Sequence, residues 1–190
     1  MRILHLSHRF VRPVALAASV AMLGATALPS HAATTPASWR QLFPPATAYP
    51  RGTHLLPVHT ATRANVLVNP ATAPQVAHLG FIVGGIQYAN LPKHAVATVT
   101  VLVLRTAGGA ATFVRTDRPA ELKDPQTPGV RVGGLGNGAR YVSGACAPCG
   151  PSAAPVGILL VQRGTVVVQI LTQPANRALT LRLGHAAVHR

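Results

Sequence analysis

The sequence predicts an α+β fold: an antiparallel β-sheet with a central hairpin and helices packed on one face, after an extended Pro-rich N-terminal leader. Three observations predict this class. Val156–Leu171 is an apolar segment that alternates about a central Arg-Gly pair, and His94–Thr106 is a second alternating run. Pro174–Val188 instead repeats its apolar residues at helical spacing.

The segment Val156–Leu171 is expected to turn at Arg163-Gly164, because the glycine can adopt the positive φ of a tight hairpin turn. This turn sets Gln162 opposite Thr165. Since side chains alternate across a strand, one face is wholly apolar: Leu159, Val161, Val166, Val168 and Ile170. The other face is expected to be partly wet, because Gln162, Thr165 and Gln169 interrupt it. These three polar residues are candidate binding residues.

Pro174–Val188 is expected to form a C-terminal helix with Pro174 in its first turn. Leu179, Leu183 and Ala187 make its apolar stripe, which should cover the apolar face of the hairpin. In the second alternating run the continuously apolar set should face the core: Ala95, Ala97, Val99, Val101 and Val103.

The remaining elements are weaker. Ala73–Leu79 suits a short helix, Ala139–Ser143 a strand, and Phe81–Tyr88 a strand with a bulge or bend at Gly84-Gly85. Gly108–Thr116 fits either a returning strand or a helix, and the proline pairs that follow it slightly favour a helix and an exposed loop.

Residues 1–32 have the features of a secretory signal peptide. A basic start precedes the apolar run Val14–Leu28, and Ser30-His31-Ala32 offers a cleavage site. The run is shorter than the ~20 residues of a spanning helix. The mature chain is therefore expected to be secreted or periplasmic, with no transmembrane segment.

Beyond the signal peptide we expect two parts. Residues 33–57 are rich in proline and should be an extended leader anchored by Trp39, Leu42 and Phe43. Residues 58–190 should form a single α+β domain.

The charge is strongly positive, with 17 Lys and Arg against 3 Asp and Glu and a net charge of +14. The arginines are scattered singly and no aromatic platform lies among them, so the sequence does not predict nucleic-acid binding. Two explanations stay open. So few carboxylates would spare the protein from acid unfolding in an acidic habitat, or the charge attracts an anionic component of the cell envelope.

Cys146 and Cys149 are the only cysteines, and in an exported protein they are expected to form a disulfide. The alternative is a thiol–disulfide or metal-handling function. A reactive cysteine needs a helix N-terminus or similar surroundings, whereas Gly150-Pro151 follows here with no helical pattern. A structural zinc site would need a second pair of ligands.

Other chemistry is poorly supported. His185 and His189 stand four apart on the expected helix and are metal-ligand candidates, although histidines are also favoured at a helix C-terminus by its dipole.

Gly133–Gly138 lacks the spacing of a phosphate loop. Hydrolase and metalloprotease motifs do not occur, so we predict no catalytic residue and no cofactor.

Two segments, Leu135–Tyr141 and Gln162–Gln169, resemble the small exported α+β modules of bacteria that include the PknH-type receptor-kinase sensor domains. In those modules a Gly-Leu-Gly-Asp-x-Ala turn precedes a hairpin of the Arg-Gly-Asn-x-Val-Val-x-Val kind. This chain has Asn137 where aspartate is usual. The resemblance covers about half of the mature chain and implies a binding or sensing module without catalytic residues. The sequence thus predicts a secreted, non-catalytic binding or sensing module.

Overall fold

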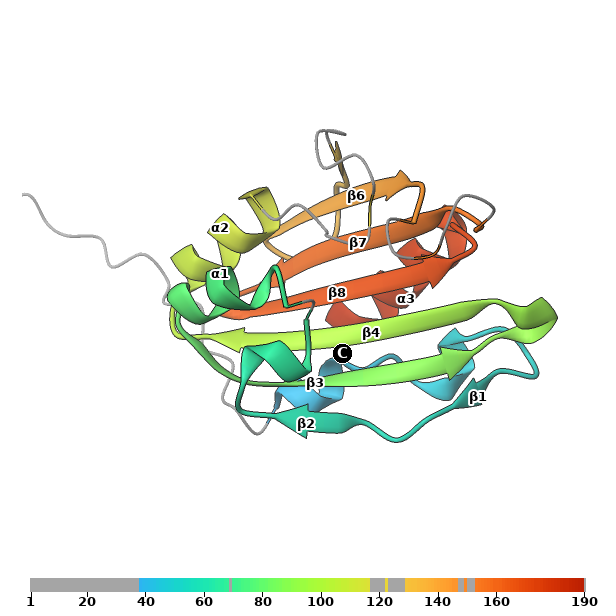
Figure 1. The fold of residues 1–190 in the computed structure, drawn as a ribbon, viewed down its shortest axis with the longest axis horizontal. Coiled ribbons are helices and arrows are strands. Elements are labelled where there is room, and N and C mark those ends of the chain that lie inside the picture. Colours follow the sequence, from blue (N-terminus) through green and yellow to red (C-terminus); the bar gives the residue numbers. More distant parts are fainter. Residues whose placement is uncertain are drawn as a thin grey trace, which may run out of the picture. The chain divides into compact units, whose positions relative to one another are not determined.

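The computed structural model describes residues 38–68, 70–116, 122, 129–146, 149 and 153–189. The predicted signal peptide, residues 1–32, lies outside the described residues. The described part contains an antiparallel sheet of eight strands with helices against it (Figure 1). None of the helices in these ranges has the length and apolarity needed to span a bilayer.

The strands are β1 (His54–Leu55), β2 (His59–Ala61), β3 (Phe81–Asn90), β4 (Val96–Leu104), β5 (Val130–Arg131), β6 (Gly138–Gly144), β7 (Val156–Arg163) and β8 (Val166–Gln173). The α-helices are α1 (Ala73–His78), α2 (Ala107–Thr116) and α3 (Arg177–Val188). Short 3-10 helices are η1 (Trp39–Leu42), η2 (Ala46–Ala48), η3 (Ala64–Val66) and η4 (Pro92–His94).

The strands lie in the order β1-β3-β4-β8-β7-β6-β5, and β2 also pairs with β3. The hairpin β7–β8 is therefore in the middle of the sheet, as the sequence predicts. The α+β class with a central hairpin is confirmed.

Both faces of β7 and most of β8 are buried. The apolar face packs with Leu179 and Leu183 of α3, as predicted. On the other face Ile158, Leu160 and Val167 have no exposed surface and share a core cluster that includes residues of α1 and α2. The expectation of helices on one face is therefore wrong, because α1 and α2 lie in front of the sheet and α3 behind it (Figure 1). The second face is partly wet as predicted, because Thr165, Gln169 and Leu171 are only half-buried.

The segment 108–116, open between helix and strand in the sequence, is helical. Thr106 precedes α2, and its hydroxyl accepts a hydrogen bond from the backbone N–H of Gly109 at 3.0 Å. This side-chain cap satisfies a backbone donor of the first turn. Phe113, with no exposed surface, then anchors the helix to the core.

The hairpin turn lies one residue later than predicted. Arg163 pairs with Val166, and the loop is Gly164-Thr165, with φ of 58° at the glycine. Gln162 consequently faces Val167. The shift moves every partner on β8 by two positions, so both faces keep their predicted residues.

A neighbouring turn holds this register. The side-chain oxygen of Asn137 accepts a hydrogen bond from the Gly164 N–H at 2.7 Å, and the Asn137 N–H donates to the Gln162 carbonyl at 2.8 Å. Gly136 has φ of 55°, and a Cβ there would collide with the same carbonyl. The two segments that resemble sensor modules therefore contact each other.

The glycines of β3 serve close packing, and they do not form the predicted bulge. The irregular register lies between Phe81 and Val83. A Cβ on Gly85 would lie 2.9 Å from the Trp39 ring.

Trp39, Leu42 and Phe43, the anchors predicted for the leader, are all buried. The division of the chain at residue 57 stays a prediction.

Helix α3 begins at Arg177, and Pro174 lies before it. The reason is Asn176, whose side-chain oxygen accepts a hydrogen bond from the Leu179 N–H at 3.0 Å. An asparagine N-cap fixes the start of a helix. The predicted stripe of Leu179, Leu183 and Ala187 is buried.

Tyr49 is a buried tyrosine whose hydroxyl affects the stability of this core and its dependence on pH. Its side chain is buried, and its hydroxyl has no hydrogen-bond partner in the described part of the chain. Burial raises the pKa of Tyr49 from 10.0 to about 12. Because the folded state holds this proton more tightly than the unfolded chain, stability falls as the pH rises from about 10 towards 12.

We predict that Tyr49→Phe raises the free energy of unfolding by about 1 kcal/mol at neutral pH, since it removes a buried polar group without a partner. The variant should also lose less stability than the wild type between pH 10 and 12. Urea unfolding measured by circular dichroism checks both effects. Tyr88→Phe, at a tyrosine that is 43% exposed, is the control. A destabilised Tyr49→Phe protein would contradict the assignment.

Candidate functional site

A groove of about 270 Å³ lies on the face of the sheet that carries α1 and α2. Those helices cover the end where β3 begins and β4 ends (Figure 1). The groove extends from there over β3, β4 and β8. Its lining consists of Val66, Leu67, Val68, Ile86, Tyr88, Thr98, Thr100, Gln169 and Leu171.

The strand register builds the floor of the groove in two rows. Ile86 pairs with Thr100, which pairs with Gln169. Two residues further along, Tyr88, Thr98 and Leu171 pair in the same way. Residues two apart on a strand point to the same face, so the two rows form one continuous surface. The segment 66–68, at the end of η3, forms the wall.

The polar groups of the groove are available to a ligand. The hydroxyls of Tyr88, Thr98 and Thr100 and the amide of Gln169 are donors and acceptors. They enter none of the side-chain hydrogen bonds found among the described residues. Among the described residues, no lysine, arginine, histidine or carboxylate lines the groove. An apolar surface with a few convergent polar groups is typical of a site for a small uncharged molecule.

The three polar residues predicted from the hairpin have separate environments. Gln169 lies in the floor of the groove. Gln162 is buried, and its side-chain amide donates to the carbonyls of Ala107 at 3.0 Å and Gly164 at 3.1 Å, so it joins the hairpin to α2. Thr165 is in the turn, where its carbonyl accepts the Leu104 N–H at 2.9 Å.

The sequence did not single out Tyr88, Thr98 or Thr100 as site residues. Thr98 and Thr100 alternate with apolar residues in β4 as the polar positions of any half-buried strand do. Only the pairing of β3, β4 and β8 brings them beside Gln169. The one sequence signal was the set of polar residues on one face of β4, which indicates a site only when the pairing of β4 with β3 and β8 is known.

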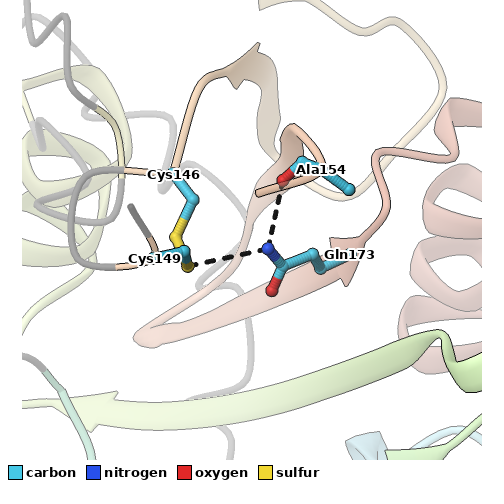
Figure 2. Close-up of a disulfide and its surroundings, with 4 residues drawn as sticks. All are labelled: Cys146, Cys149, Ala154 and Gln173. Carbon is cyan, nitrogen blue, oxygen red and sulfur yellow. Dashed lines mark hydrogen bonds between the residues drawn. A yellow bond between two sulfur atoms is a disulfide. The ribbon is translucent and has the colours of Figure 1, made fainter. Parts of the chain in front are cut away.

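Cys146 and Cys149 are joined by a disulfide at the end of β6 (Figure 2). The side-chain nitrogen of Gln173 lies 3.6 Å from Cys149 Sγ and donates to the Ala154 carbonyl at 3.0 Å. Cys146 is buried and Cys149 exposed. The regular elements on either side, β6 and β7, are both strands.

Of the two histidine candidates, His185 lies in the last turn of α3 and His189 is the residue that follows the helix. Their rings stack with centroids 5.4 Å apart. Among the described residues no group of three or more histidine, cysteine or acidic side chains is arranged to hold a metal ion.

Comparison with known proteins identifies the fold. No protein-family model and no curated protein sequence matches this chain. A solved structure, the extracellular domain of PknH from Mycobacterium tuberculosis, matches 84% of this chain and 97% of its own length, with a TM-score of 0.58 and 12% identity. The chain resembles the PknH extracellular domain in fold. At this identity the likeness concerns the fold alone, and it confirms the resemblance predicted from Leu135–Tyr141 and Gln162–Gln169.

The disulfide can be tested as a structural rather than a redox feature. The Cys146→Ala/Cys149→Ala variant should fold and lose about 2 kcal/mol of stability, the amount expected for closing so short a loop. The wild type should show no free thiol in denaturant without reductant, and it should not oxidise a reduced dithiol peptide. Turnover of such a peptide that Cys149→Ser abolishes would instead establish the thiol–disulfide alternative.

Proposed function

We propose that this chain is an exported, non-catalytic binding or sensing module whose groove over β3, β4 and β8 takes a small uncharged ligand. The observation that carries the proposal is the pair of rows in the groove floor. They place four polar side chains beside Ile86 and Leu171, and none of the described residues in the lining is charged. A ligand with an apolar body and a hydroxyl or amide edge complements this surface.

The rigidity of the floor supports the proposal. Val101 and Val168, which point to the opposite face of β4 and β8, are fully buried against the core that includes α3. A ligand therefore meets strands already fixed by packing, so little conformational entropy is lost on binding.

The proposal of export rests on residues 1–32 and agrees with the extracellular setting of the PknH domain.

The groove can be tested with the neutral fluorescent probe N-phenyl-1-naphthylamine, which combines an apolar body with one N–H donor. We expect saturable binding at one site. Thr98→Phe, which fills the groove floor, should weaken binding by more than about tenfold through steric exclusion. Thr60→Phe, at an exposed position of β2 in the same sheet, is the control. Equal binding by the two variants would refute the groove as the site.

We also propose that the basic surface holds the module to an anionic component of the cell envelope. The only carboxylate side chains of the chain, Asp117, Glu121 and Asp124, lie outside the described residues. Every side chain of the described part that is charged at neutral pH is consequently an arginine or a lysine. Such a surface attracts polyanions over distances of about a Debye length.

One end of the sheet presents several of these groups together. The β3–β4 connection exposes Lys93 and His94, and both have positive φ, 60° and 59°. The neighbouring turn exposes Arg51, and a Cβ on the next residue, Gly52, would lie 3.8 Å from Pro92. This end of the sheet, the basic tip, is distinct from the uncharged groove.

Cosedimentation with phosphatidylglycerol vesicles tests the basic tip. Binding should weaken steeply as the salt concentration rises from about 50 to about 500 mM, because salt screens the attraction between exposed charges. Arg51→Gln/Lys93→Gln should weaken it more than Arg105→Gln/Arg182→Gln, which removes the same charge from other exposed positions. Equal losses would place the attraction in net charge alone, and salt-independent binding would contradict an electrostatic contact.

A further inference from the structure

The C-terminal end of α3 presents two histidines side by side, one in its last turn and one directly after it. His185 and His189 are four residues apart and both exposed. Side chains at this spacing are neighbours on one helix face. Their rings are nearly parallel, with an interplanar angle of 16° and centroids 5.4 Å apart. Two imidazoles are thus already close on one face.

This turn is fixed to the core although it is close to the chain end. Leu183 and Ala187 have no exposed surface, and Val188 is 6% exposed. The His189 N–H donates to the His185 carbonyl at 3.1 Å. Chain ends are usually poorly ordered unless they are docked, and here Ala187 and Val188, between the two histidines, are buried. The pair is therefore held in place by packing.

A backbone carbonyl orients one of the rings. His189 Nε2 lies 3.3 Å from the carbonyl oxygen of Gly134, in the turn before β6. A carbonyl only accepts, so in the neutral ring Nε2 carries the proton and Nδ1 keeps its lone pair. Metal-binding histidines commonly donate their second ring N–H to a carbonyl or carboxylate in this way.

We propose that His185 and His189 form a two-histidine site for a divalent transition-metal ion of the Cu²⁺ or Zn²⁺ class, with the Gly134 carbonyl orienting His189. Imidazole nitrogen suits these ions. Calcium and magnesium require oxygen ligands, which no carboxylate among the described residues provides. With two protein ligands the remaining coordination positions are filled by water, so the ion is exchangeable.

The site is independent of the groove and the basic tip, and its test leaves those proposals untouched. Because an ion that binds only the folded chain stabilises it, metal should raise the melting temperature. Cu²⁺ should bind more tightly than Zn²⁺, following the usual order of divalent ions.

The experiment titrates the tag-free exported chain with CuCl₂ and ZnCl₂ by isothermal calorimetry and follows the histidine ring protons by NMR with Zn²⁺. We expect one ion per chain, with the ring signals of His185 and His189 shifting together. His185→Gln and His189→Gln should each weaken binding by more than about tenfold, as losses of metal-site groups do. His78→Gln, which removes a single exposed histidine from the last turn of α1, should bind as the wild type does.

Three results would overturn the proposal: no binding by the wild type, equal losses in all three variants, or Zn²⁺-induced shifts confined to one of the two rings. Circular dichroism of each metal-free variant controls for folding. Gln replaces an exposed ring at both positions, so the metal-free melting temperatures should stay close to that of the wild type.

Discussion

The burial of strand β7 on both faces is the constraint on which the rest of this structure depends. Leu159 and Val161 point to one side of the sheet, and Ile158 and Leu160 to the other, and all four have no exposed surface. A strand buried on both faces requires two covering layers. Here α3 supplies one layer and α1 with α2 the other, and the remaining strands extend the sheet outward from β7.

The second layer is shorter than the sheet, and this difference creates the groove. The helices α1 and α2 cover one end of their face (Figure 1). Beyond them the cross-strand rows through Thr98 and Thr100 are walled by the residues that follow η3. The opposite side of the same strands remains packed on the α3 core. One sheet therefore combines a rigid floor with an accessible polar surface, whereas the arginines and lysines lie elsewhere.

Much of this fold could be predicted from residue patterns. Alternation fixed the two faces of β7 and β8, and helical spacing identified Leu179 and Leu183 as the stripe of α3. The hairpin register could not be predicted, because it depends on a hydrogen bond from Gly164 to the side chain of Asn137, 27 positions earlier. The sequence left α2 open between helix and strand, because Gly108 and Gly109 favour helix poorly and the helix forms with a cap from Thr106.

The candidate site was harder to predict for a related reason. Gln162 and Gln169 are equivalent interruptions of an apolar segment in the sequence, yet one bonds the Ala107 carbonyl and the other lines the groove. The two glutamines differ because different elements of the fold lie next to each of them. Thr98 belongs to the site only because of its partners on β3 and β8. Site residues that gather from three strands have no local spacing by which to find them.

Native-state amide hydrogen exchange most directly tests the claim that the doubly buried strand β7 organises this fold. The amides of β7, β8 and β4 should exchange only through global unfolding, because β7 is packed between two layers and β8 and β4 are each hydrogen-bonded to a strand on both sides. The groove wall at residues 66–68, with Val66 59% exposed, should exchange through smaller local openings. Faster exchange in β8 than in the outer strand β3 would contradict the account.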